Sequence, residues 1–235
     1  MKQQLVDLIT AARAREESDL VPHVDDTPPD APGRWTAKDQ LSHLTAWRQV
    51  AAAEIDAVRT ASAGPVVPGD DNDANAQIYM RTHADPAAAV RDAAAKSWDQ
   101  LAAALEACSE ADLAKPRLRH AETGENLSQE IAGNSFYHLA EHLVYLHTDR
   151  GEEAAAEKAA QWAYEMALSI NPSERSKGTA SYNLGCFYAA RGRTDKAMPL
   201  LRKGIELRPE LREWANKDSD LDPIRTAPEL LSLLA

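Results

Sequence analysis

Cysteine is nearly absent from this sequence of 235 residues. The two cysteines, Cys108 and Cys186, lie far apart in the chain. Two such residues provide neither the disulfide framework of a small secreted domain nor the paired spacing of a zinc finger. The sequence therefore predicts a protein of a reducing compartment.

Long apolar runs are also missing. No stretch approaches the roughly 20 apolar residues that a membrane-spanning helix needs. The first twenty residues, "MKQQLVDLITAARAREESDL", carry charge throughout and lack the apolar core of a signal peptide. We therefore expect a cytoplasmic, soluble protein with no membrane partner.

Positive charge is scarce and unevenly distributed. The chain has 26 Lys and Arg against 37 Asp and Glu, a net charge of −11, which makes nucleic acid an improbable partner. Residues 1–150 hold 14 basic and 24 acidic side chains (14 − 24 = −10), and residues 151–235 hold 12 and 13 (12 − 13 = −1). All 7 histidines lie in the first part, so two domains are expected, 1–150 and 151–235.

Alternating patterns of β-branched residues are nearly absent, and helical periodicity dominates. The first part favours an all-α fold, an up-down four-helix bundle. Residues 63–75, "AGPVVPGDDNDAN", are expected to form a long acidic loop. The four helices are expected at about 2–19, 37–62, 86–108 and from 127 onward.

Three helix starts carry capping signals. Thr36 is a good N-cap residue, with Asp39 at the capping-box position. Asn126 plays the same part, with Gln129 three residues later. In "DPAAAV", Asp85 is expected to cap a helix whose first residue is Pro86.

Residues 151–235 have a different pattern. "SKGTASYNLGCFYAARGRTDKAMPLLRKGIELRPE" fits the tetratricopeptide (TPR) pattern, with its small residues where paired helices approach closely. The helix before it, which ends near Pro172, resembles the second half of another repeat, and the last segment is expected to cap the exposed apolar face. The matching positions are Leu184, Gly185, Tyr188, Ala197, Leu201 and Pro209.

The stretch "YHLAEHLVYLH" (residues 137–147) places three histidines on one expected helix. At about 100° per residue, His138 and His142 share the apolar stripe, whereas His147 falls about 180° from His138. His147 is therefore expected at the surface. The same construction puts His43 on the inner face of the helix that begins after Thr36.

Three inward histidines on two helices can form a metal site. A pair at i, i+4 brings two rings close enough to reach one ion, and a third ring from a facing helix completes a three-histidine set. Such a set leaves one coordination position open for water or substrate. The alternative is that these histidines are ordinary hydrogen-bonded residues of the core.

Three segments together resemble the DinB-like superfamily, over about residues 1–150. They are "RWTAKDQLSHLTAWRQVAAAEI", "DANAQIYMRTHADPAAAVRDAAAKSWDQL" and "NSFYHLAEHLVYL". The resemblance implies a four-helix bundle and, as in many members, a divalent ion, zinc or nickel. The implied ligands are His43, His138 and His142. The related DfsB/ClbS-like branch, which contains resistance proteins, often lacks the full histidine set that this chain keeps.

The resemblance implies a metal-assisted transferase or hydrolase acting on a small electrophilic molecule, of a detoxification or resistance type, with a low-molecular-weight thiol as a possible co-substrate. The alternative is a non-catalytic module that sequesters a small molecule or binds a protein, in which the metal is structural or absent. The TPR-like part would then mediate self-association, bind a partner, or stabilise the bundle.

Three further residues are candidates for the pocket. Glu54 shares the inner face of its helix with His43 and could act as a general base, or pair with a cation at the helix end. Trp47 could wall the pocket or only pack in the core. Asn134 could orient a ligand histidine or substrate, or hydrogen-bond across the bundle.

Overall fold

The computed structural model describes residues 1–26, 35–67, 69–170 and 173–234. Within these ranges the protein is all-α and contains no β-strand, as expected. The chain divides into two compact units, Met1–Leu146 and His147–Ala235. No helix in the described ranges combines the length and the apolarity needed to cross a membrane.

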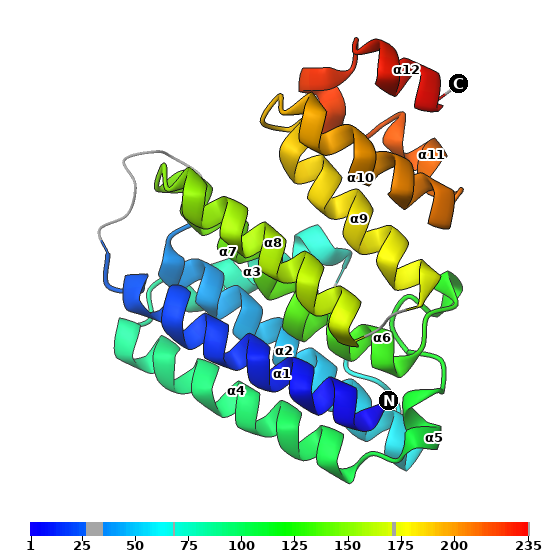
Figure 1. Cartoon of the computed structure of the whole chain (residues 1–235). Helices are drawn as coiled ribbons and strands as arrows, with labels where there is room; N and C mark the ends of the chain where they lie inside the picture. Colours follow the sequence, from blue (N-terminus) through cyan, green and yellow to red (C-terminus); the bar gives the residue numbers. More distant parts are fainter. Residues whose placement is uncertain (27–34, 68, 171–172, 235) are drawn as a thin grey trace. The chain divides into compact units, whose positions relative to one another are not determined.

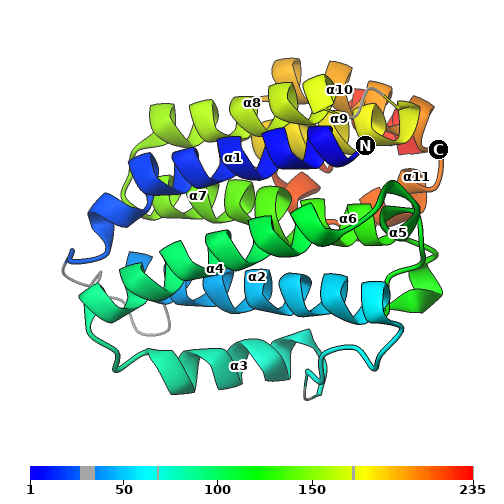
Figure 2. The same cartoon turned by 90° about the horizontal axis from the view of Figure 1, so that it is seen from below.

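The first unit is a bundle of four long helical segments (Figures 1 and 2). These are α1 (Lys2–Asp19), α2 (Ala37–Thr60), α4 (Ala87–Ala107) and a fourth segment made of α6 (Leu127–Ala132), η3 (Gly133–Tyr137) and the start of α7 (His138–Asp149). The shorter elements are η1 (Val21–His23), α3 (Asp71–Thr82), α5 (Glu110–Leu113) and η2 (Ala121–Thr123).

The capping boxes expected at two helix starts are confirmed. The Thr36 side chain accepts a hydrogen bond from the Asp39 backbone N–H, and the Asp39 carboxylate accepts one from the Thr36 N–H. Asn126 and Gln129 make the same reciprocal pair at α6. The expectation at α4 is wrong by one residue, because Pro86 itself is the N-cap and no side chain caps the helix.

The expected acidic loop at 63–75 is wrong in its second half, where α3 begins. Asp70 and Asp73 form a capping box that starts this helix. Ala74 and Ile78 on α3 then pack against Trp47 of α2, which gives the short helix an apolar partner. Four acidic or amide residues in a row therefore start a helix instead of extending the loop.

The fourth helical segment is interrupted by a π-helical turn, η3, directly before His138. The buried Ser135 hydroxyl donates to the Ile131 carbonyl oxygen at 2.6 Å within this stretch. A π-turn changes the angular offset between the residues on its two sides. Leu127, Ile131 and Ser135 before His138 are nevertheless all buried, so the segment keeps its apolar face toward the bundle.

One ion pair is enclosed in the core of the first unit. The guanidinium of Arg48, 0% exposed, donates to both carboxylate oxygens of Glu16, at 2.6 and 3.1 Å. The Arg48 Nε also donates to Ser97, and the indole N–H of Trp98 donates to Glu16. These contacts satisfy the two buried charges and tie α1, α2 and α4 together.

The second unit contains α8 (Glu153–Ile170), α9 (Glu174–Ala189), α10 (Thr194–Leu207), α11 (Leu211–Ala215), η4 (Ser219–Ile224) and α12 (Pro228–Leu234). Helices α9 and α10 form a closely packed antiparallel pair (Figure 1). A Cβ atom at Gly185 would lie 2.9 Å from the Leu201 side chain, and one at Gly204 would lie 3.0 Å from the Tyr182 backbone nitrogen. A side chain at either position would be closer to α9 or α10 than ordinary van der Waals contact, so the two helices approach closely at these glycines.

Candidate metal centre

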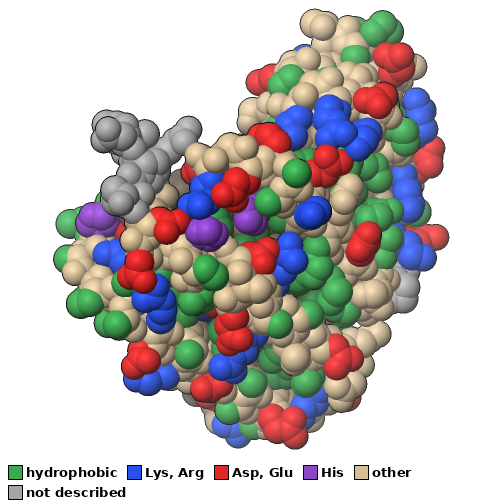
Figure 3. Space-filling model, turned by 60° about the vertical axis from the view of Figure 1, so that its left-hand side comes forward, with side chains coloured by type: hydrophobic (Ala, Val, Ile, Leu, Met, Phe, Trp, Pro, Cys, Tyr) green, Lys and Arg blue, Asp and Glu red, His purple; other side chains and the backbone are tan. Residues whose placement is uncertain are grey.

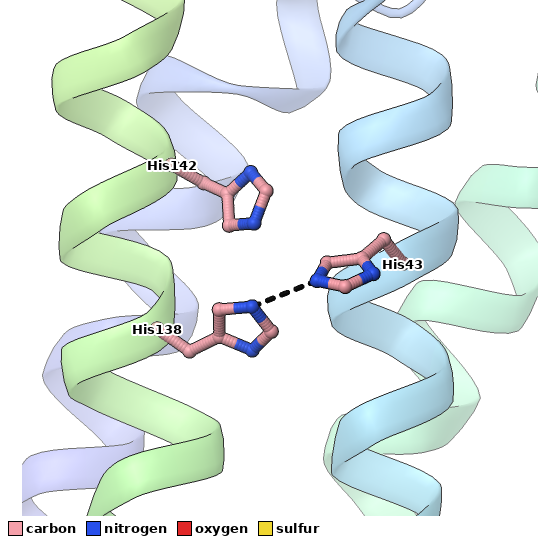
Figure 4. Close-up of side chains that lie close together, drawn as sticks. All are labelled: His43, His138 and His142. Atoms are coloured by element: carbon pink, nitrogen blue, oxygen red, sulfur yellow. Dashed lines mark hydrogen bonds between the residues drawn. The ribbon is translucent and has the colours of Figure 1, made fainter. Parts of the chain in front are cut away.

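The three histidines on the inner faces of two helices lie together. His43 comes from α2, and His138 and His142 come from successive turns of α7 (Figure 4). The Nε2 atoms of His43 and His138 are 2.8 Å apart, and one ring nitrogen from each of the three residues lies within 4.8 Å of the others. This group could hold a metal ion.

Burial keeps the three imidazoles neutral. His43 is 4% exposed and His142 is 8% exposed. Desolvation, with a contribution from the charge of His138, lowers the pKa of His43 from 6.5 to about 3. Desolvation lowers the pKa of His138 to about 4, assisted by the Arg48 charge, and that of His142 to about 2, assisted by the other two histidines. Each ring therefore offers a free lone pair at neutral pH.

The second ring nitrogens are held differently in the three residues. The His142 Nδ1 lies 3.3 Å from the side-chain oxygen of Gln40, a buried residue of α2. The Nδ1 atoms of His43 and His138 are buried and have no hydrogen-bond partner in the described part of the chain. Only His142 is therefore oriented by a protein group behind it.

The chemistry of the donor set fits a divalent transition-metal ion. All three members are neutral imidazoles, which suit zinc, nickel, copper and iron, whereas magnesium and calcium require oxygen ligands. The two Nε2 atoms on opposite helices are 2.8 Å apart, a hydrogen-bond distance, and a separation of roughly 3.3 Å would let both bind one tetrahedral ion. A set of three also leaves a position for a further ligand.

Aromatic rings surround the group, and one of them was not expected from the sequence. The ring of Trp35 lies 4.8 Å from that of His43, edge to face, and is stacked with His142 and Tyr79 at 6.3 and 6.1 Å. Gln40 was also missed. Trp35 stands directly before the Thr36 cap, and its contacts reach side chains on α2, α3 and α7 that no local pattern brings together. Figure 3 shows histidine side chains reaching one face, bordered by acidic and basic groups.

The Glu54 carboxylate contacts the backbone of another segment, at a distance from the three histidines. Its side chain is fully buried, and one carboxylate oxygen, Oε1, accepts the backbone N–H groups of Leu118 and Arg119. No ion pair of Glu54 occurs among the described residues, and its carboxylate contacts none of the three histidines. Glu54 thus anchors the segment before η2 to α2.

Trp47 and Asn134 are also accounted for by other contacts. The Trp47 ring packs in a core with α3, its N–H donates to Asn75 at 3.0 Å, and the Arg119 guanidinium lies over its face. Its centroid is nevertheless 6.4 Å from that of His43, so it also borders the histidine group. The Asn134 amide donates to Glu130 at 2.6 Å, within its own helical segment and not across the bundle.

His147 is buried, contrary to the expectation of a surface position. It is 7% exposed, and its Nδ1 shares a hydrogen bond of 2.8 Å with the Glu152 carboxylate. The chain reverses at Gly151, where φ is +71°, and the Glu152 N–H donates to the His147 carbonyl. The turn after α7 therefore supplies a partner for His147, which helical geometry alone had placed at the surface.

A second cluster of potential ligands lies in the other unit, formed by Cys186, Asp218 and Asp220. Asp218 already accepts hydrogen bonds from the Tyr182 hydroxyl at 2.8 Å and from the Cys186 thiol at 3.5 Å. Burial, with the charge of Asp218, raises the pKa of the Cys186 thiol. Because metals bind the thiolate, this cluster is better described as a hydrogen-bond network that joins α9 to η4.

Comparison with known proteins identifies the family of the first unit. No curated protein and no solved structure gave a significant match. The model of the DinB superfamily, in contrast, matches residues 3–146, a range that holds all three clustered histidines and the whole helical bundle. The chain therefore belongs to the DinB superfamily.

Proposed function

We propose that this protein binds a divalent metal ion, zinc or nickel, through His43, His138 and His142. The observation that supports the proposal is the convergence of three neutral imidazoles from α2 and α7 on one point. Membership of the DinB superfamily, whose proteins often bind metal, also supports it.

The proposed reaction is a metal-assisted transfer or hydrolysis on a small electrophilic molecule. A bound ion of this kind lowers the pKa of a coordinated water or thiol toward neutrality, which supplies a nucleophile. The protein's own contribution is to hold the three imidazoles neutral and to exclude water around them with Trp35 and Tyr79. A low-molecular-weight thiol is the proposed co-substrate, and detoxification or resistance is the proposed role.

The first experiment measures metal content and metal-dependent stability. Untagged protein is expected to purify with close to one equivalent of zinc or nickel. Zinc added to the apoprotein is expected to raise its melting temperature, and His43→Ala, His138→Ala and His142→Ala each to abolish this shift. His23→Ala is the matched control, since His23 lies outside the group and its ring pairs with Asp26, three residues later. No ion in the purified protein, with an unchanged zinc response in all three variants, would refute the proposal.

The second experiment distinguishes an enzyme from a binder. Metal-loaded protein is incubated with small electrophiles, including strained-ring compounds, with and without low-molecular-weight thiols, and products are followed by mass spectrometry. Turnover that His142→Ala removes supports the enzyme. Stoichiometric retention of a small molecule without turnover would instead support a sequestering protein in which the metal is structural.

We further propose that the second unit is TPR-like. Its support is the α9–α10 pair, in which Gly185 and Gly204 stand where the TPR pattern requires small residues. The proposed role is self-association or binding of a protein partner. The mass of the full chain and of residues 1–150, measured by light scattering, tests this role, because self-association through the second unit makes only the full chain a multimer.

A further inference from the structure

Gln40 is a polar side chain that makes a hydrogen-bond contact with the histidine group. It lies on α2, three positions before His43, and is 4% exposed. Its side-chain oxygen faces the Nδ1 of His142 on α7 at 3.3 Å. The contact therefore joins the helix that carries one histidine to the helix that carries the other two.

This contact decides which nitrogen of His142 is available. An oxygen acceptor next to Nδ1 selects the tautomer with the proton on Nδ1 and leaves the Nε2 lone pair free. The ring of His142 is also held in rotation, because its centroid lies only 5.0 and 4.9 Å from those of His43 and His138. Loss of the acceptor would free both the tautomer and the ring.

The group that accepts from the His142 Nδ1 is the neutral amide of Gln40, whereas the second ring nitrogen of a metal-binding histidine often donates to a carboxylate. None of the three imidazoles hydrogen-bonds to an Asp or Glu side chain in the described part of the chain. The charged side chain that contributes to the lowered pKa of His138 is Arg48, which is positive. An ion held here would thus receive no negative charge from its three proposed ligands or from Gln40, which favours an anionic further ligand.

We infer that Gln40 is a positioning residue for His142, and that its neutral side chain makes the centre selective for an anionic ligand. The inference rests on the proposed metal binding by His43, His138 and His142. It concerns the affinity of the three histidines for the metal ion and the preference of the bound ion for an anionic further ligand, and it does not depend on which reaction the protein catalyses.

The test uses the full chain with Gln40→Met, Gln40→Asn and Gln40→Glu. Methionine keeps the side-chain volume but has no oxygen acceptor. Asparagine keeps the amide but is too short to reach the His142 Nδ1. Glutamate keeps an oxygen acceptor and adds a negative charge. Ser42→Ala is the matched control, since Ser42 is buried on the same helix and its hydroxyl has no hydrogen-bond partner among the residues that the structure describes. Affinities for zinc and cobalt are measured by chelator competition, and thiocyanate binding by the visible spectrum of the cobalt form.

We expect Gln40→Met and Gln40→Asn to bind both metals about 10- to 100-fold more weakly and to change the cobalt spectrum. Gln40→Glu is expected to restore metal affinity but to bind thiocyanate about tenfold more weakly than the original protein, because the added carboxylate offsets the charge of the ion. Ser42→Ala should match the original protein in every measurement.

Three outcomes would overturn the inference. The first is that Gln40→Met and Gln40→Asn bind metal as tightly as the original protein. The second is that Gln40→Glu binds metal no more tightly than Gln40→Met. The third is that thiocyanate binds to the cobalt form of Gln40→Glu as tightly as to that of the original protein. Failure of the original protein itself to bind zinc or cobalt would instead refute the proposed function. Circular dichroism of each apoprotein shows whether a weaker affinity comes from unfolding.

Discussion

At the scale of single residues, burial keeps the histidines of the centre neutral, so that each can donate a lone pair to a metal ion. The imidazoles of His43, His138 and His142 lose most of their hydration, and this desolvation is the largest cause of each lowered pKa. Neutrality at pH 7 is what a metal ligand requires, because a protonated imidazole has no lone pair to donate.

This lowering predicts how the stability of the apoprotein depends on pH. The folded pKa values, about 3, 4 and 2, lie below the ordinary value of 6.5, so the unfolded chain binds more protons. Stability is therefore full above about pH 6.5 and falls on acidification toward the folded pKa values. We expect a loss of about 2 kcal/mol per histidine between pH 7 and pH 5, measured by urea unfolding. His142→Asn should make the dependence shallower, and an equal slope would contradict this prediction.

The enclosed ion pair gives a second prediction at this scale. Glu16→Gln leaves the fully buried Arg48 guanidinium without a counter-charge, so we expect the free energy of unfolding to fall by about 3–5 kcal/mol. Glu17→Gln is the matched control on the same helix. Its partner is Arg13, and the Glu17 side chain is 57% exposed, so its loss should cost at most about 1 kcal/mol. Equal losses in denaturant unfolding would show that burial is not decisive here.

Element scale. Helix α2 is the element on which the centre is built. Its capping box at Thr36 and Asp39 fixes where the helix begins, and this start sets Trp35, Gln40 and His43 relative to one another. Helix α3 then covers the outer side, where Tyr79 stacks on Trp35. The π-turn η3 immediately precedes the helix that carries the other two histidines.

The α9–α10 pair gives a prediction at the scale of elements. Gly204→Val would place side-chain atoms against the backbone of α9 near Tyr182, so the two helices would have to separate. We expect a loss of about 1–3 kcal/mol in the free energy of unfolding, from overpacking. Gly133→Ala is the control, because a Cβ atom there meets nothing within 4 Å. A Gly204→Val variant as stable as the control would show that close helix approach is not required.

Whole-molecule scale. The family match and the candidate centre lie wholly within residues 3–146, that is, within the first unit. We therefore predict that residues 1–150 alone bind zinc with an affinity within about threefold of the full chain, since no proposed ligand is removed. His43→Ala in the same fragment should abolish binding. A folded fragment that no longer binds zinc would show that the second unit contributes to the centre.

Local patterns were reliable where local interactions decide the outcome. The capping boxes at Thr36 and Asn126 and the first helix at 2–19 were predictable because their hydrogen bonds lie within four residues. The start of α3 was missed although Asp70 and Asp73 also form a local cap, since packing against Trp47 was needed to recognise it. The burial of His147 depends on a chain reversal that helical periodicity does not describe.

The sequence by itself determined that three histidines face the interior of a helical bundle, because a helix repeats every 3.6 residues and its apolar stripe must be buried. Only the tertiary structure decided that His43 and His138 meet at 2.8 Å, that Gln40 stands behind His142, and that Trp35 lies beside His43. These contacts join side chains on different elements. Their distances depend on how helices pack, which no local pattern specifies.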